Sequence, residues 1–155
     1  MRPMPIRLSS VEAFLDWAKK KISLHHREDG LYFYEREVWW VSLGQNVGSE
    51  ENGKHQRFER PVLIYKKLSR DLFFGIPLTT KTKEGTWYHS FLFEGQARTA
   101  ILAQMRVLSG KRLIRKMGNI TPEVFVEVEK ALLGLIKTDP PVETRGSSEP
   151  IARPM

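Results

Sequence analysis

Two apolar runs separated by a short polar break constrain the fold of this chain more than any other feature of its sequence. The runs are RPVLIYKKL, which begins at Arg60, and LFFGIPLTT, which ends at Thr80 and includes Thr79. Both are rich in residues that favour strands, and the polar break between them is typical of a turn. Pro61 lacks a backbone donor, so it belongs at the start or the edge of its strand. The sequence therefore predicts a β-hairpin with strands at residues 61–68 and 72–79.

The length of the turn decides which residues face each other across this hairpin. If the turn has two residues, Leu68 pairs with Asp71 and Arg60 lies directly opposite Thr79, with Cβ atoms about 5 Å apart. A four-residue loop gives the same register, whereas a three-residue loop shifts it and separates the pair. In the first two cases a guanidinium and a hydroxyl meet at the mouth of the hairpin, near solvent.

An arginine and a threonine that converge at such a rim can hold a phosphate. The guanidinium offers a fork of donors that matches phosphate oxygens, and Thr79 adds a hydroxyl. Donors of this kind stabilise the extra negative charge of a pentacoordinate phosphoryl state. The alternative is an exposed Arg60 beside the end of a strand, and the pattern alone leaves both interpretations open.

The other segments predict a mainly β (α+β) domain with a helix near each end. Strands are expected at residues 36–44, 86–93 and within 97–109, a long loop at 45–59, and helices at 9–22 and 121–136. The natural architecture is a small SH3-like barrel of antiparallel strands with a C-terminal helix. We divide the chain into an N-terminal helical extension (1–35), the barrel domain (36–137) and a disordered, proline-rich tail (138–155).

Apolar residues recur at helical spacing in both predicted helices. The first helix carries one apolar stripe, formed by Val11, Phe14, Leu15, Ala18 and Ile22. The second has Thr121 as a good N-cap and Pro122 in its first turn. Its buried stripe is predicted to contain Phe125, Val128, Leu132 and Leu135.

The formal net charge of +7 favours polyanionic partners such as nucleic acid, although it can also serve only to keep the surface soluble. The chain has no cysteine, which excludes disulfides and thiolate chemistry. Neither a signal peptide nor a run of about 20 apolar residues is evident, so we expect a cytoplasmic protein without a membrane anchor.

Four motifs, taken in order, resemble PemK/MazF-type toxins of type II toxin–antitoxin systems. They are VWWVSLGQNVGSEENGK, RPVLIYKK, GIPLTTK and AILAQMRVLSGKRLIRKMGNIT, and the resemblance covers residues 36–136. It implies a metal-independent endoribonuclease that needs no cofactor and cleaves single-stranded RNA at short sequences. In such enzymes the RNA 2′-hydroxyl attacks the adjacent phosphate and leaves a cyclic phosphate. The resemblance also implies a homodimer and a cognate antitoxin as partner.

The same resemblance assigns roles to particular residues. Arg60 and Thr79 match the catalytic pair, and Glu50 in the GSE turn matches an acidic position that helps to shape the site. An arginine pKa above about 12 favours electrostatic stabilisation by Arg60 over general-base catalysis. The remaining candidates for RNA contact are Ser49, Phe58, Thr80, Lys81, Lys83, Gln104 and Arg106. Phe58 is the expected base-stacking residue, in a loop that residues 55–59 lengthen relative to the family.

Several alternatives stay open. His55 and His89 could form an acid–base pair, and the basic run KRLIRK (111–116) could follow an RNA backbone or line the solvated side of a hairpin or loop. No carboxylate and histidine cluster has the spacing of a metal site.

At the level of function, the alternatives are a non-catalytic RNA-binding or regulatory module and a topoisomerase poison on the same fold. The extension could cover a dimer face, contact the antitoxin or add core.

Overall fold

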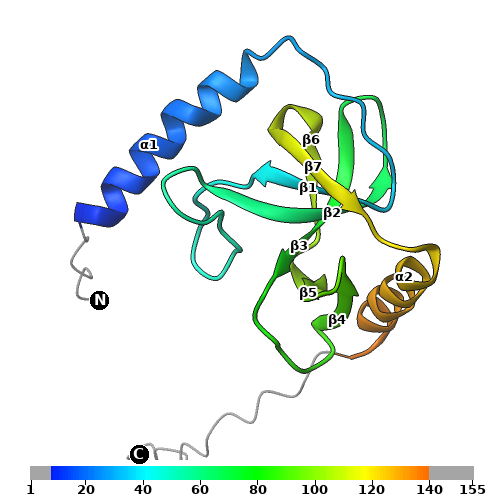
Figure 1. Cartoon of the computed structure of the whole chain (residues 1–155). Helices are drawn as coiled ribbons and strands as arrows, with labels where there is room; N and C mark the ends of the chain where they lie inside the picture. Colours follow the sequence, from blue (N-terminus) through cyan, green and yellow to red (C-terminus); the bar gives the residue numbers. More distant parts are fainter. Residues whose placement is uncertain (1–7, 140–155) are drawn as a thin grey trace, which may run out of the picture.

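The computed structural model describes residues 8–139, and it has two α-helices and seven strands in that part of the chain (Figure 1). Most of the tail for which disorder was predicted therefore lies outside the described residues. The elements, in order, are α1 Leu8–His25, β1 Glu37–Ser42, β2 Glu59–Lys67, β3 Leu72–Thr79, β4 Tyr88–Phe93, β5 Gln96–Ile101, η1 Leu102–Gln104, β6 Arg106–Ser109, η2 Gly110–Arg112, β7 Leu113–Asn119 and α2 Pro122–Lys137. Neither α1 nor α2 is both long and apolar enough to cross a membrane.

All strands belong to one antiparallel sheet in the order β4-β5-β3-β2-β1-β7, with β6 paired to β3. The first half of β3 pairs with β6 and its last two residues pair with β5, so β3 connects two parts of the sheet. The predicted class, mainly antiparallel strands with a helix near each end, is confirmed. Within residues 8–139 no pairing joins β4 to β7, and the sheet is therefore open rather than closed by backbone hydrogen bonds.

Strand β7 has no counterpart in the strands that the sequence predicts. It begins within the basic run 111–116, where charged residues obscure the strand pattern. In the fold these cations have protein partners: the Arg115 guanidinium lies 4.8 Å from the ring centroid of Trp40, and Lys116 Nζ lies 3.0 Å from Glu37 Oε1. The run from Leu113 onward is thus part of the sheet, with Arg115 and Lys116 packed against β1.

The β2–β3 hairpin reaches the expected register by an unexpected route. Leu68 donates its backbone N–H to the backbone oxygen of Leu72, which closes a three-residue loop in place of the two-residue turn. That loop alone would separate Arg60 from Thr79. A β-bulge at Tyr65 inserts one extra residue into β2 and reverses the shift. Val62 then pairs with Pro77, and the same register continued by two residues sets Arg60 opposite Thr79.

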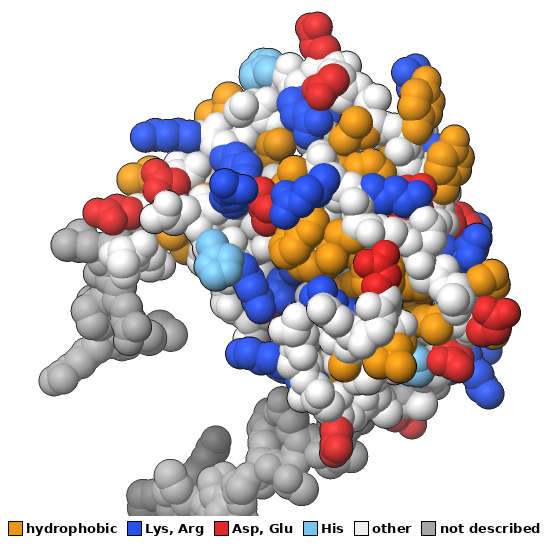
Figure 2. All heavy atoms as spheres, in the orientation of Figure 1, with side chains coloured by type: hydrophobic (Ala, Val, Ile, Leu, Met, Phe, Trp, Pro, Cys, Tyr) orange, Lys and Arg blue, Asp and Glu red, His pale blue; other side chains and the backbone are white. Residues whose placement is uncertain are grey.

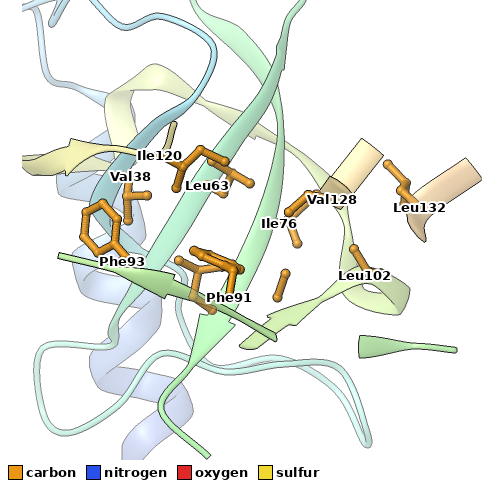
Figure 3. Packing of buried hydrophobic residues seen from close by; sticks show 11 residues of the cluster. Val38, Leu63, Ile76, Phe91, Phe93, Leu102, Ile120, Val128 and Leu132 are labelled. Atoms are coloured by element: carbon orange, nitrogen blue, oxygen red, sulfur yellow. The ribbon is translucent and has the colours of Figure 1, made fainter. Parts of the chain in front are cut away.

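Alternate residues of the central strands fill two hydrophobic clusters, one on each face of the sheet. Figure 3 shows the cluster between the sheet and α2, to which Val38 of β1, Leu63 of β2 and Val128 of α2 belong. The neighbouring residue Trp39 lies in the other cluster, with Val62 and Phe73. This alternation follows from the two-residue period of a strand. Both faces of β1 and β2 are buried, so these strands form a rigid support for their ends.

Helix α2 matches its sequence prediction closely. The Thr121 hydroxyl accepts a hydrogen bond from the backbone N–H of Val124, at 3.2 Å, as an N-cap does. Val128 and Leu132 are buried, while Phe125 and Leu135 pack at the edge of the same cluster. The predicted stripe is therefore confirmed as the face that α2 turns to the sheet.

Helix α1 forms where expected but does not bury the predicted stripe. The side chains of Val11, Phe14, Leu15 and Ile22 are between 37% and 62% exposed, and Ala18 is exposed as well. Of residues 9–25, Trp17 is the buried one. It lies about 120° around the helix from the centre of that stripe, because successive residues are rotated by about 100°. The sequence pattern thus identified the helix and selected the wrong face for packing.

Candidate active site

Arg60 is a buried arginine near the start of β2, where it is 6% exposed. Within residues 8–139 its guanidinium makes three polar contacts. Nε donates to the backbone oxygen of Asn52 at 2.7 Å, and Nη1 donates to the backbone oxygen of Leu78 at 3.2 Å. Nη2 lies 2.5 Å from Oε1 of Glu51. The guanidinium is thereby held between the loop that precedes β2 and the residue next to Thr79.

These contacts do not use all the N–H donors of Arg60. A guanidinium has five N–H groups, and the three contacts use one from each nitrogen, which leaves one N–H on Nη1 and one on Nη2. Burial lowers the pKa of Arg60 from its ordinary value, and the nearby Glu51 carboxylate opposes that shift. Two N–H groups on a buried cation suit a phosphate or carboxylate ligand.

Thr79 ends β3 beside this guanidinium and is also 6% exposed. It pairs with Thr99 of β5, whose hydroxyl lies 2.9 Å from Ser90 Oγ. The hydroxyl oxygen of Thr79 accepts a hydrogen bond from the backbone N–H of Lys81, at 3.2 Å. Because the oxygen acts as acceptor there, its own O–H is free to donate to a ligand.

The loop between β1 and β2, residues 43–58, supplies the acidic partner of Arg60. That partner is Glu51, whereas Glu50 accepts a hydrogen bond from the backbone N–H of Val47 and is exposed. The sequence presents two adjacent glutamates, and the resemblance selected Glu50. Neighbouring side chains of a loop point in different directions, so only the folded loop distinguishes them.

Two of the residues proposed for RNA contact, Gln104 and Arg106, hold this loop in place, and a third, Ser49, lies within it. The Gln104 side chain accepts from the backbone N–H of Glu51 at 3.1 Å and donates to the backbone oxygen of Ser49 at 3.0 Å. Arg106 Nη1 donates to Asn46 Oδ1 at 3.3 Å. Ser49, Gln104 and Arg106 are therefore brought together at the loop. Gln104 and Arg106 also line a hollow of about 240 Å³, and Glu51 forms part of its wall.

The other proposed RNA contacts lie in different settings. Thr80, Lys81 and Lys83 are exposed just beyond Thr79, and Lys83 Nζ lies 5.4 Å from the ring centroid of Tyr88. Phe58 is not an exposed stacking residue: it is 6% exposed and packs against Trp17 of α1. The sequence placed Phe58 in a loop without indicating that a distant helix covers it, so its prediction as a base-stacking residue was wrong.

The two histidines of the alternative mechanism lie in separate surroundings. His55 lines a hollow together with Trp40 and its own neighbours in the loop. His89 in β4 faces Glu127 of α2, with 3.7 Å between His89 Nε2 and Glu127 Oε2. The polar contacts of Arg60 within residues 8–139 include neither histidine. In the same part of the chain, no group of three or more His, Cys, Asp and Glu side chains is arranged to hold a metal ion.

The family model for PemK-like and MazF-like toxins of type II toxin–antitoxin systems matches residues 34–136. The chain therefore belongs to this family, whose members are generally endoribonucleases. The match begins after α1 and spans the sheet and α2. No curated protein matches the chain.

Solved structures share the fold at low sequence identity. Form I of MazF from Deinococcus radiodurans has a TM-score of 0.57 and 19% identity, and the likeness covers 70% of this chain and all of that one. An endoribonuclease from Mycobacterial species, in complex with its cognate antitoxin, has a TM-score of 0.54 and 16% identity, with the same coverage. Mycobacterium tuberculosis toxin MazF-mt6 has a TM-score of 0.51 and 15% identity, over 67% of this chain and 99% of that one.

Proposed function

We propose that this protein is the toxin of a type II toxin–antitoxin pair and acts as an endoribonuclease on single-stranded RNA. The observation that carries the proposal is the buried Arg60, which retains two N–H donors unused within residues 8–139 and whose strand register sets it opposite Thr79, whose hydroxyl accepts from the Lys81 N–H and can donate to a ligand. Membership of the toxin family supports the same reaction class. A buried cation with a neighbouring hydroxyl donor suits a phosphate whose negative charge increases during reaction.

The proposed reaction is transfer of a phosphodiester to the adjacent 2′-oxygen. That oxygen forms a bond to phosphorus while the bond from phosphorus to the 5′-oxygen breaks, which yields a cyclic phosphate and a 5′-hydroxyl. One proton leaves the 2′-oxygen, and a proton from solvent water reaches the 5′-oxygen. Arg60 and Thr79 stabilise the charge on the non-bridging oxygens. Glu51 is the carboxylate in contact with Arg60. We propose that it acts as the general base and accepts the proton of the 2′-hydroxyl.

The surface is suited to an anionic polymer. Figure 2 shows Lys and Arg side chains spread across the upper middle of one face, over the sheet, with acidic and hydrophobic side chains among them. Lys54, Arg57 and Arg115 line one hollow together with Trp40 and His55. Such cations add a salt-dependent, sequence-independent term to RNA binding. We expect Thr80, Lys81 and Lys83 to contact the strand next to Thr79, since all three are exposed there.

The decisive experiment incubates purified protein with a long single-stranded RNA in excess EDTA. We expect cleavage at a few sites, with cyclic phosphate and 5′-hydroxyl ends. Arg60→Ala should abolish cleavage, and Arg60→Lys should lower it at least about tenfold because an ammonium lacks the planar fork. Arg70→Ala is the matched control, since Arg70 is exposed in the turn of the same hairpin.

If the RNA stays intact while binding persists, the protein is instead a non-catalytic RNA-binding module. If cleavage occurs only without EDTA, the reaction depends on a metal and the assigned chemistry is wrong. If the protein binds no RNA at all, a topoisomerase poison on the same fold becomes the favoured alternative.

The proposed partners are a cognate antitoxin and a second copy of the chain. Two of the similar structures are complexes with an antitoxin, one of them MazE with MazF from Deinococcus radiodurans. Light scattering at micromolar concentration tests the homodimer, and co-expression with a small acidic protein encoded beside the gene tests the antitoxin. A cytoplasmic location stays a prediction, consistent with RNA as substrate.

A further inference from the structure

Helix α1 lies outside the residues that the family model matches, yet it contacts the loop that holds Arg60. Figure 1 shows α1 beside the β1–β2 loop. The contact passes through one large side chain, Trp17, which is 6% exposed, while Leu15 in the same helix is 58% exposed. Lys20 adds a hydrogen bond from Nζ to the backbone oxygen of Arg57 at 2.5 Å.

Trp17 is seated on the two ends of the loop. Its ring lies 5.6 Å from that of Phe58, and its indole covers Gly44 so closely that a Cβ at Gly44 would overlap it. Gly44 and Phe58 are also joined directly, because the backbone N–H groups of Leu43 and Gly44 both donate to the oxygen of Phe58. The guanidinium of Arg112, which directly precedes β7, lies 5.6 Å from the Trp17 ring centroid.

The loop backbone is held in conformations that need external support. Gly44 has φ +94°, and the bulky Phe58 has φ +57°. A non-glycine residue in the left-handed region costs on the order of 1–3 kcal/mol and persists where surrounding contacts enforce it. The ring of Trp17 supplies such a contact at Phe58. Loops without buried apolar contacts open at low free energy, so removal of this anchor is expected to loosen residues 43–58 selectively.

The same loop supplies two of the three contacts of Arg60, from the Glu51 carboxylate and the Asn52 carbonyl. Its middle is further held by Gln104, at Ser49 and Glu51. A displacement of about 1 Å in a group that orients reacting atoms can lower a rate by about 100-fold. A path of contacts therefore runs from Trp17 through the ends of the loop to the guanidinium.

We propose that α1 is a positioning element of the active site, with Trp17 as the positioning residue that orders the β1–β2 loop and thereby orients Arg60. The expected effect on kcat rests on the proposed ribonuclease function, whereas the expected effect on the order of the loop does not. The N-terminal extension thus contributes to catalysis through the loop. The exposed apolar stripe of α1 has no part in this role.

The test compares Trp17→Ala, Trp17→Phe and Leu15→Ala in the full chain. Hydrogen exchange of the peptide that covers residues 44–58 is measured by mass spectrometry, and RNA cleavage is measured as kcat and KM. Because the anchor is local, Trp17→Ala is expected to increase exchange in this peptide at least about tenfold and to leave exchange in β4 and β5 within about twofold. It should also lower kcat at least about tenfold, with KM changed less. Trp17→Phe should keep most of the exchange protection of the loop and most of kcat, and Leu15→Ala should match the wild type in both.

Unchanged exchange in the loop of a folded Trp17→Ala variant would overturn the proposal, as would a uniform increase over the whole sheet. If Trp17→Ala does not fold, Lys20→Met replaces it, since the Lys20 ammonium bonds to the loop backbone at Arg57 and its loss should raise exchange there alone. If the wild type cleaves no RNA, the proposed function fails, while the exchange experiment still decides whether α1 orders the loop.

Discussion

Nη2 of Arg60 lies 2.5 Å from Oε1 of Glu51, at a place where Arg60 is almost fully buried. This ion pair joins β2 to the loop before it and leaves part of the guanidinium free. Removing one partner of a buried pair leaves an uncompensated charge, which is why such pairs are sensitive to substitution. The site is therefore expected to be as sensitive to substitution of Glu51 as to substitution of Arg60.

Glu51→Gln is therefore expected to lower the RNA cleavage rate at least about tenfold, because the amide can neither balance the Arg60 charge nor accept a proton. Initial rates on a short RNA substrate measure the effect. Glu50→Gln is the comparison that separates the two glutamates, since Glu50 lines the same hollow but its carboxylate accepts from the backbone N–H of Val47 instead of contacting Arg60. Equal losses in both variants would refute a specific role for Glu51.

Gly44→Ala is expected to destabilise the protein by about 2–4 kcal/mol. Alanine is strained at φ +94°, and its methyl group would overlap the indole of Trp17. Urea unfolding followed by tryptophan fluorescence gives the free energy of unfolding. Gly30→Ala is the control, because a methyl group at Gly30 would meet no heavy atom within 4 Å and its φ lies outside the left-handed region. A destabilisation of Gly44→Ala no larger than that of Gly30→Ala would contradict the predicted clash and strain.

The N-cap of α2 gives a second test of stability. Thr121→Ala removes the acceptor for the Val124 N–H and should cost about 1 kcal/mol of unfolding free energy. Thr121→Ser keeps the hydroxyl and should retain most of it. Thermal unfolding by circular dichroism measures both. If serine and alanine are equally destabilising, the hydroxyl is not the relevant group.

Tyr65 should make stability depend on pH in the alkaline range. Burial, together with a hydrogen bond to Glu129, raises its pKa to about 12. The unfolded value is about 10, so folding favours the neutral phenol. This contribution is fully present below pH about 10 and is lost as pH rises through about 12. Absorbance titration of tyrosinate should show one late-titrating group that Tyr65→Phe removes.

The control for this titration is Tyr32→Phe, because Tyr32 is 71% exposed. Its loss should leave the late-titrating group in place. A titration in which all four tyrosines of the chain ionise together near pH ~10 would exclude the effect of burial and Glu129 on Tyr65.

Much of the fold and part of the site could be predicted from local pattern. The hairpin strands, α2 with its cap at Thr121, and the pairing of Arg60 with the end of β3 all depend on residues close in sequence or on the period of a strand. The hairpin prediction succeeded with a wrong turn length, because the bulge at Tyr65 compensates for a three-residue loop. Sequence does not reveal a bulge that packing selects.

The sequence by itself determined the antiparallel class, the family and the identity of Arg60 and Thr79 as the candidate pair. Only the tertiary structure decided which glutamate meets Arg60, that Phe58 is covered, and which side of α1 packs. The physical reason is that each of these depends on how segments outside a single helix or strand come together. Trp17 of α1 and Phe58 of the loop are far apart in the chain, and no local propensity encodes that one will bury the other.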